Sequence, residues 1–305
     1  MIAYTLKRLG LAVLVALLVS AVAFLLLRLS GDPALAIAGE GARDADIEMV
    51  RKTYGLDRPL AVQYAEWLWT VLRGDFGQSL YFKTGVWSLV ADKLPVTFLV
   101  GGFSILFALV LSIPLGVLAA VFAGSWIDRF ALAVAVIGQA LPTFFFALVL
   151  MLLFSINLRW LPVSGSDTWW HFVMPTIALG YYVTPPMMRL VRAGMIEVLS
   201  SDYIRTARAK GLSGTSVVLK HGLRNAVVPV VALAAVQLGY LLGGSIVIET
   251  VFALDGLGYL AYQSIQHKDF PVTQAVLLLL SLIYVLLTLA ADLLNAFLDP
   301  RIRVA

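Results

Sequence analysis

From Leu94 to Ile127 the chain reads LPVTFLVGGFSILFALVLSIPLGVLAAVFAGSWI, without a single Asp, Glu, Lys or Arg. An α-helix needs about 20 residues to cross a hydrocarbon core of about 30 Å. This stretch therefore holds one complete membrane span with flanking residues on either side. Pro114 lies inside it and predicts a kink. A segment of this length and composition indicates a membrane protein.

The rest of the chain has the same apolar character. Of its 305 residues, 61% are hydrophobic and 13% are charged, and the mean hydropathy is +0.92. Soluble domains carry about 25% charged residues, so the composition excludes disordered, fibrous and ordinary cytosolic proteins. Cysteine is absent, and the three histidines form no HExxH motif, which argues against a thiolate metal site and a zinc hydrolase. We expect no cofactor and no bound metal.

Further stretches free of charged residues are long enough to span a membrane. Backbone amides in lipid must be paired within their own segment, so helices are the default, and the alternating pattern of barrel strands is absent. The sequence predicts an all-α membrane protein with six transmembrane helices. The six windows are Leu9–Leu27, Leu94–Ile127, Phe130–Leu158, Thr168–Met188, Asn225–Ile248 and Phe270–Ala291. The first has no small-residue cleavage site before Arg28, so we expect an uncleaved helix rather than a signal peptide.

Basic residues are distributed unequally between the two sets of loops. Cytoplasmic loops of membrane proteins carry an excess of Lys and Arg. On one side, the short loops contain only Arg159 and Lys268. The side of the two termini holds Lys7, Arg8, Arg129, Arg189, Arg192, Arg205, Arg208, Lys210, Lys220, Arg224, Arg301 and Arg303. We predict that both termini lie in the cytoplasm.

The predicted spans divide the chain into four parts. Residues 1–30 form an N-terminal transmembrane helix, residues 31–93 an extracytoplasmic helical segment, residues 94–298 a five-helix core with a cytoplasmic loop at 189–225, and residues 299–305 a tail. In the extracytoplasmic segment, Asp44–Tyr54 and Leu60–Leu72 have helical spacing, and Gly74 and Gly77 end the second helix. That helix is rich in Trp and Tyr, which suits either packing against the bundle or docking of a partner.

The loop between the fourth and fifth windows contains SDYIRTARAKG from Ser201 to Gly211. This stretch predicts a short helix with Asp202 as its cap and Gly211 at its end. Ala207 and Gly211 are small and lie one turn apart, which predicts a bare face that could lie in another protein's groove. A basic cytoplasmic loop without a special role is the alternative.

The same loop, SDYIRTARAKGLS followed by KHGLRNAVVPVV, resembles the coupling loop of ABC importer permeases of the dipeptide/oligopeptide/nickel family. The wider family pattern is Glu-Ala-Ala, three residues, then Gly. Ala207 matches the second alanine and Gly211 the glycine, whereas Arg205 and Thr206 replace the glutamate and the first alanine. Other matches follow in order along the chain: GDP from Gly31, YGLDRPL from Tyr54, GDFGQS from Gly74, WLPVSG from Trp160 and LDPRIR from Leu298.

This resemblance implies the membrane subunit of a type I ABC importer in the bacterial inner membrane. Such a subunit is not an enzyme, because ATP is hydrolysed by partner subunits, and a GxxxxGK[ST] phosphate loop is indeed absent here. The implied partners are a second homologous permease, two ABC ATPase subunits, an extracytoplasmic solute-binding protein and the lipid bilayer, with no nucleic acid. The implied solute is a short peptide, or a related nickel chelate or glutathione. The implied ATPase-coupling residues are Asp202, Tyr203, Arg205, Thr206, Ala207, Arg208, Ala209, Lys210 and Gly211.

Polar residues and prolines inside the predicted spans are candidates for the solute pathway or its gate, because polar groups in lipid are costly. Gln139, Pro142 and Gln237 are the candidates. The stretch GLGYLA from Gly256 has the form of a dinucleotide fingerprint, but it follows a predicted span rather than a strand. The resemblance instead places Gly256 and Gly258 in an external loop at the cavity mouth, where glycines would let the backbone turn sharply.

A second class of function is a stand-alone carrier driven by protons. Its proton site would be Asp292, a carboxylate near the end of the last window. In an ABC importer, Asp292 would instead anchor the end of that helix near Arg301.

Overall fold

The computed structural model describes residues 2–39 and 41–298, and these residues form helices and loops without a β-strand. Two of the short elements, η1 and η3, are π-helical and one, η2, is a 3-10 turn. In chain order the elements are α1 (Ile2–Ser30), α2 (Pro33–Ala38), α3 (Asp44–Thr53), α4 (Leu60–Leu72), α5 (Val86–Val121), α6 (Trp126–Ala140), α7 (Thr143–Leu150), η1 (Met151–Asn157), η2 (Trp169–Phe172), α8 (Val173–Leu199), α9 (Asp202–Ala209), α10 (Gly214–Ser216), η3 (Val217–Leu223), α11 (Arg224–Ala226), α12 (Val228–Val251), α13 (Leu257–Gln266) and α14 (Phe270–Leu298).

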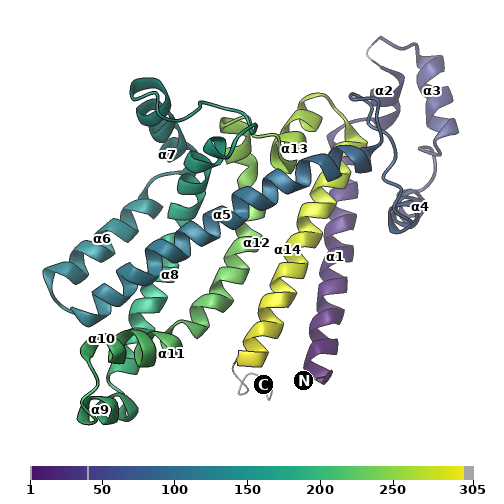
Figure 1. Cartoon of the computed structure of the whole chain (residues 1–305). Helices are drawn as coiled ribbons and strands as arrows, with labels where there is room; N and C mark the ends of the chain where they lie inside the picture. Colours follow the sequence, from purple (N-terminus) through teal and green to yellow (C-terminus); the bar gives the residue numbers. More distant parts are fainter. Residues whose placement is uncertain (1, 40, 299–305) are drawn as a thin grey trace.

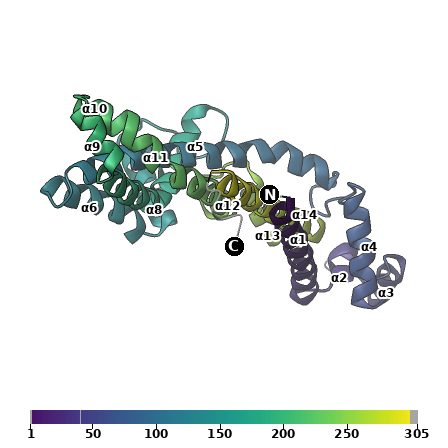
Figure 2. The same ribbon diagram turned by 90° about the horizontal axis from the view of Figure 1, so that it is seen from below.

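The long helices α1, α5, α8, α12 and α14 make up the body of the molecule (Figure 1). Helix α1 packs on α14, α14 packs on α12, and α12 contacts both α5 and α8. Seen from below, the molecule is elongated, with α6, α9 and α10 at one end and α2–α4 at the other (Figure 2). The arrangement is therefore a row of packed helices with a small helical appendage after α1.

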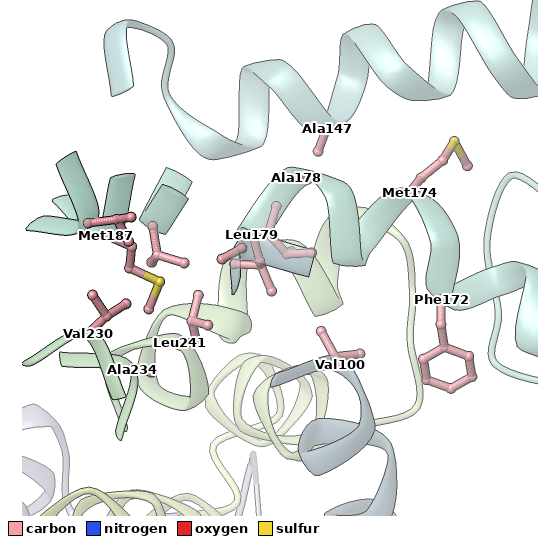
Figure 3. Close-up of a cluster of buried hydrophobic side chains, with 14 of the residues drawn as sticks. Val100, Ala147, Phe172, Met174, Ala178, Leu179, Met187, Val230, Ala234 and Leu241 are labelled. Carbon is pink, nitrogen blue, oxygen red and sulfur yellow. The ribbon is translucent and has the colours of Figure 1, made fainter. Parts of the chain in front are cut away.

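The main core lies where α5 and α8 cross. Leu179 of α8, Val100 of α5 and Leu241 of α12 belong to the same buried cluster (Figure 3). The two helices approach closely because glycines face the contact. A Cβ at Gly180 would lie 2.6 Å from the Ser104 carbonyl oxygen, and one at Gly116 would lie 2.6 Å from the Val191 Cβ. Burying this apolar surface is the main stabilisation that the core offers.

Three helices of the described residues are long and apolar enough to cross a membrane. They are Tyr4–Leu26 within α1, Val86–Val121, which is α5, and Phe270–Leu294 within α14. A fourth span is possible if Gly214–Ala226 and Val228–Gly243, which meet at a bend of 50°, act together. The fold is all-α and membrane-spanning as predicted, but the count of six helices is not confirmed by these criteria.

The third predicted window is divided in the structure. Helix α6 ends at Ala140, Pro142 precedes α7, and η1 continues the chain to Asn157. Proline has no amide hydrogen to donate and fixes its own φ, so the chain starts a new helix there. The fourth window, Thr168–Met188, begins with the 3-10 turn η2 and continues into α8, which extends past Met188 to Leu199. Pro114 lies inside α5, which remains one assigned helix from Val86 to Val121.

The beginning of α1 and the end of α14 lie at the same end of the molecule, together with α9, α10 and α11 (Figure 1). Helices α2, α3, α7 and α13 lie at the opposite end (Figure 1). The loop that was singled out in the sequence therefore lies on the same side as the start of α1 and the end of α14. The LDPRIR stretch begins at Leu298, and its other residues lie outside the described part of the chain.

The two helices predicted after the first span are present. Helix α3 runs from Asp44 to Thr53 and α4 from Leu60 to Leu72. Gly74 follows α4 with a φ of +82°, a left-handed conformation that favours glycine and ends the helix. Further along, Ser79 donates a hydrogen bond to the buried carboxylate of Asp269. This contact fastens the loop after α4 to the start of α14.

We predict that Gly180→Leu lowers the thermal stability of the protein. Its side chain would meet the Ser104 carbonyl oxygen and the ring of Phe107, which lie 2.6 Å and 2.8 Å from the position of a Cβ. Overpacking of this kind costs about 1–3 kcal/mol. The midpoint of thermal aggregation in detergent, followed by size-exclusion chromatography, measures the effect. Gly102→Leu is the control, because a Cβ there meets nothing within 4 Å; equal midpoints for the two variants would contradict the prediction.

Candidate functional site

Helix α9 is attached to the body of the protein by one buried face. Ile204 is 0% exposed and Ala207 is 7% exposed, and both pack against Val217 of η3. Val198 and Leu199, at the end of α8, complete this small cluster. Residues three apart lie on the same face of a helix, so Ile204 and Ala207 together fix how α9 is turned.

The bare face predicted from Ala207 and Gly211 is therefore wrong. Ala207 faces inward, where its small side chain lets α9 lie close to η3. Gly211 lies beyond the helix with a φ of +75°, and a Cβ there would meet nothing within 4 Å. The outward face is formed by larger, mostly polar side chains, all of them exposed: Asp202, Tyr203, Arg205, Thr206, Arg208, Ala209 and Lys210.

The start of α9 also differs from its prediction. Ser201, with an extended backbone, is the residue before the helix, and Asp202 is the first helical residue rather than its cap. The Asp202 carboxylate accepts a hydrogen bond from the Arg205 guanidinium at 3.0 Å. An acidic residue in the first turn still interacts favourably with the helix dipole. Gly211 ends the element as predicted, and its N–H donates to the Arg208 carbonyl at 2.9 Å.

A polar contact links α9 to the base of α12. The Tyr203 hydroxyl donates to the His221 carbonyl at 3.3 Å and accepts from the Asn225 amide at 2.8 Å. His221 belongs to η3, and Asn225 belongs to α11, which leads into α12. A displacement of α9 would therefore act directly on the entry to α12.

A buried ion pair joins α6 to α8 near the same end of the molecule. The Arg192 guanidinium donates two hydrogen bonds of 2.7 Å to the Asp128 carboxylate, which also accepts from the Gly124 N–H at 2.9 Å. Asp128 is 4% exposed. The hydrogen bonds from Arg192, with that from Gly124, lower the pKa of Asp128 to about 2. The sequence offered no sign of this pair, because the partners are 64 positions apart and Arg192 counted only as a basic loop residue.

At the opposite end, the Glu249 carboxylate holds the start of α13. One of its oxygens accepts from the Thr97 hydroxyl at 2.9 Å and from the Ser245 hydroxyl at 2.8 Å. The other accepts from the N–H groups of Gly258 at 2.7 Å and Tyr259 at 3.1 Å. Glu249 is 0% exposed. Four donors and the positive end of α13 therefore stabilise a carboxylate that would otherwise be costly to bury.

Gly256 and Gly258 are present at this site for reasons of space. Gly256 has extended backbone angles, with a φ of −108°, which any residue can adopt. The sharp turn that we expected therefore does not explain why a glycine occupies this position. A Cβ at Gly256 would lie 2.4 Å from the nearer Glu249 carboxylate oxygen, and one at Gly258 would lie 2.5 Å from the Ile246 Cα. Sequence analysis found the two glycines but missed Glu249, which is the residue they make room for.

The other candidate residues lie on separate elements. Gln139 is exposed near the end of α6, and Pro142 lies at the break before α7. Gln237 is partly buried in α12.

The Asp292 carboxylate forms an ion pair with the Arg8 guanidinium of α1 at 3.0 Å. Its partner in the described part of the chain is therefore near the N-terminus. Arg301, the partner expected from the sequence, lies outside the described residues. Within the described residues, His, Asp and Glu nowhere gather in a group that could hold a metal ion.

Comparisons with protein families cover almost the whole chain. The family described as "Binding-protein-dependent transport system inner membrane component" matches residues 112–304. A second family, the N-terminal part of the same kind of membrane component, matches residues 1–101. The N-terminal match ends at residue 101 and the other begins at residue 112, so the break between them falls inside α5, whereas the predicted boundary is at residue 94.

Curated relatives match over their full length. The glutathione transport system permease protein GsiC of Salmonella typhimurium LT2 is 44% identical over 304 residues, with 99% of each chain covered. The protein of the same name from Escherichia coli K12 is 43% identical with the same coverage.

Solved structures share the fold at lower identity. The inward-facing MetNI methionine ABC transporter aligns with a TM-score of 0.58 and 23% identity over 69% of this chain and 96% of that one. An amino acid ABC transporter crystallised with histidines gives a TM-score of 0.51 and 16% identity over 70% of this chain and 94% of that one. The helical core is therefore that of ABC importer permeases.

We predict that Asp128→Asn destabilises the protein in a way that depends on pH. The folded pKa of about 2 lies below the ordinary 3.8, so the carboxylate contributes its full stability above about pH 4 and loses it as the pH falls toward 2. At pH 7 we expect a loss of about 2 kcal/mol. Thermal midpoints measured from pH 8 to 3 should differ by a constant amount above pH 5 and converge below pH 4.

The control for this experiment is Asp202→Asn. The Asp202 side chain is 93% exposed and its pair with Arg205 lies on the surface, where such pairs contribute about 0–1 kcal/mol. A difference for Asp128→Asn that is no larger than this control, or that stays constant down to pH 3, would contradict the assigned role of the ion pair.

Proposed function

Since the chain belongs to the family of binding-protein-dependent transport system inner membrane components, and is the permease subunit of an ABC importer, we propose that the solute it carries is a short peptide or a peptide-like molecule such as glutathione. The full-length identity to permeases named for glutathione transport supports this choice. Glutathione is itself a tripeptide, so the proposal agrees with the resemblance of the sequence motifs to those of dipeptide and oligopeptide importer permeases. Being a transport subunit, the chain is not an enzyme and depends on ATPase partners.

We further propose the composition of the complete transporter. It contains this chain, a second homologous permease, two ABC ATPase subunits at the α9 end and a solute-binding protein at the α13 end. The outward face of α9 supports the first contact, since Arg205, Arg208 and Lys210 are exposed on a helix whose other face is fixed. A rigid, cationic surface suits recognition of an acidic groove.

The proposed coupling role of α9 rests on its contacts with η3 and with the residues that precede α12. Ile204 and Ala207 bind it to η3, and Tyr203 binds it to the residues that lead into α12. A ligand-driven change shifts a protein only through contacts that differ between its two states. Closure of the ATPase dimer would change the contacts made by α9. Because α9 is attached to η3, α8 and the start of α12, a movement of α9 would also move α8 and α12.

The pathway is proposed to run along the helices from α5 to α14, with its outer mouth at α13. Gly256 and Gly258 hold the start of α13 against Glu249, so they act as part of an external gate. Gln139, Pro142 and Gln237 are proposed to line or bend this pathway. The division into residues 1–30, 31–93, 94–298 and 299–305 is retained as a proposal for the domain organisation.

The first test is Gly211→Trp in the assembled transporter in proteoliposomes. Gly211 has a positive φ, where a bulky side chain is strained, and it borders the proposed ATPase contact. We expect the variant to insert and assemble its membrane part, but to lose ATP-dependent uptake of labelled glutathione and short peptides. Gly74→Trp is the control, since Gly74 has a φ of +82° and open space around it but lies after α4.

Normal uptake by Gly211→Trp, or equal loss in both variants, would refute the coupling role. Uptake of neither glutathione nor peptides by the unmodified transporter, with ATPase activity intact, would refute the proposed solute.

The second test concerns orientation. The distribution of basic residues leads us to propose that both termini, with α9, lie in the cytoplasm. An alkaline phosphatase fused after Arg303 should therefore be inactive, and one inserted near Gly41 should be active. The reverse pattern of activity would show that the molecule is inserted the other way round.

A further inference from the structure

Helix α4 lies beside the membrane-spanning part of α1. The Tyr64 hydroxyl is 2.7 Å from the Ser20 hydroxyl and donates to the Leu17 carbonyl at 3.3 Å. The Phe24 ring contacts the rings of Tyr64 and Trp67, with centroids 5.6 Å and 5.8 Å apart. The apolar span of α1 ends at Leu26. At 1.5 Å per residue, Leu17 lies about 13 Å below that end.

This depth places α4 within the outer part of the hydrocarbon region rather than above it. A helix in that position should present apolar residues outward, where lipid would surround it. The side of α4 that faces away from α1 has this composition. Ala61, Val62, Ala65, Trp69 and Leu72 are exposed there, and this apolar strip is bordered by the exposed Thr70 and by Glu66, which is paired with Arg58.

A cavity of about 440 Å³ lies between α4, the end of α1 and the start of α14. Aromatic side chains form much of its wall, with Phe24 from α1, Trp67 from α4, Phe76 from the following loop and Phe270 from α14. Phe270 is also the first residue of the apolar span of α14. The cavity therefore lies where two spans leave the hydrocarbon core.

Three polar groups at this cavity are without their usual partners. The Gln63 amide donates to the Leu56 and Arg58 carbonyls, but its buried oxygen accepts no hydrogen bond, although the residue is only 8% exposed. The buried amide nitrogen of Gln274 likewise has no acceptor. Arg28 lies over the Phe24 ring at 4.9 Å, and within residues 2–39 and 41–298 it forms no ion pair. The carboxylate of Asp32 attracts Arg28, but it is already paired with Arg51 at 2.6 Å.

The acidic residues at the cavity are already engaged. Glu66 forms an ion pair with Arg58 at 2.5 Å, and the Asp75 carboxylate accepts from the Gly77 N–H at 2.8 Å. The unmatched groups are thus one cation, one amide donor and one amide acceptor. A ligand that satisfies them carries an anion beside a hydrogen-bond donor, and buried polar groups left unpaired are costly.

We propose that α4 is immersed in the membrane leaflet at the α2–α4 end of the molecule and that the cavity binds the headgroup of a phospholipid. Its phosphate accepts hydrogen bonds from Arg28 and the Gln274 amide. The hydroxyl or ammonium group of the headgroup donates to the Gln63 oxygen. The acyl chains leave the cavity into the surrounding leaflet, which also contacts the apolar outward face of α4. This lipid contact is independent of the transported solute and of ATP.

The position of α4 is tested with single-cysteine variants, which need no background substitutions because the chain has no cysteine. Ala65→Cys lies on the outward face of α4, and Met49→Cys is the control on α3, where Met49 is 65% exposed. In the assembled transporter in lipid nanodiscs, a charged maleimide should label Met49→Cys and spare Ala65→Cys. A nitroxide at Ala65→Cys should collide with oxygen rather than with a water-soluble nickel chelate. Equal labelling of the two cysteines would overturn the immersion of α4.

The headgroup site is tested by native mass spectrometry of the delipidated transporter with added phosphatidylglycerol. Loss of a charge-assisted hydrogen bond weakens binding about tenfold or more, so Arg28→Gln should lose that factor in affinity. Arg43→Gln is the control, since the Arg43 side chain is 85% exposed and pairs with Asp46. Arg28→Lys keeps the charge and should bind more tightly than Arg28→Gln, which separates binding from misfolding.

Two results would overturn the headgroup site. One is equal retention of phosphatidylglycerol by Arg28→Gln and Arg43→Gln. The other is binding of water-soluble glycerol 3-phosphate as tightly as the lipid, because it would assign the cavity to a free phosphate ester. Neither result bears on uptake, so failure here and failure of the proposed function are distinguishable.

Discussion

The close contact between α5 and α8 is the interaction on which the other features depend. It exists because Gly116 and Gly180 leave no side chain where the two backbones meet. The same two helices then carry the polar fastenings at opposite ends of the molecule: α5 supplies Thr97 to the carboxylate that holds α13, and α8 supplies Arg192 to the ion pair with α6. The contact between α5 and α8 thus fixes the two helices from which these polar contacts are made to α12 and to α6.

Helix α12 connects the two ends of this arrangement. It has 24 residues, which at 1.5 Å per residue is about 36 Å, roughly the thickness of a membrane. At one end it follows Asn225, which contacts Tyr203 of α9, and near the other it carries Glu249, which contacts the start of α13. A helix paired throughout by its own backbone is stiff along its axis, so a shift imposed at α9 reaches α13 with little loss. For the proposed ATPase contact at α9 and the proposed binding-protein contact at α13, α12 offers a physical route that needs no long chain of side-chain contacts.

Local signals in the sequence were sufficient for local structure. Helical spacing placed α4 at Leu60–Leu72 as observed, and Gly211 was correctly expected to end α9. The predictions that failed concerned side chains whose contacts are with residues far away in the sequence. Ala207 was expected to lie on the outward face of α9, but it packs against Val217 in a buried cluster. The apolar composition of the third window, Phe130–Leu158, also did not show that the chain would form separate helices on either side of Pro142. Glu249 and Thr97 are 152 positions apart, a separation that no periodicity reports. Glu249 was therefore missed, although the two glycines beside it were found.

The carboxylates of Glu249 and Asp269 explain how α13 and the loop after α4 are held against the body of the molecule. Each is 0% exposed and accepts several hydrogen bonds, Glu249 from the start of α13 and Asp269 from the loop after α4. Such groups are stable only while all their donors stay in place, since a buried carboxylate that loses its partners is far more costly than an exposed one. α13 therefore cannot swing away on its own without stranding Glu249. In the proposed gating role of α13, opening would move α12 and α13 together, with the carboxylate and its donors as one unit.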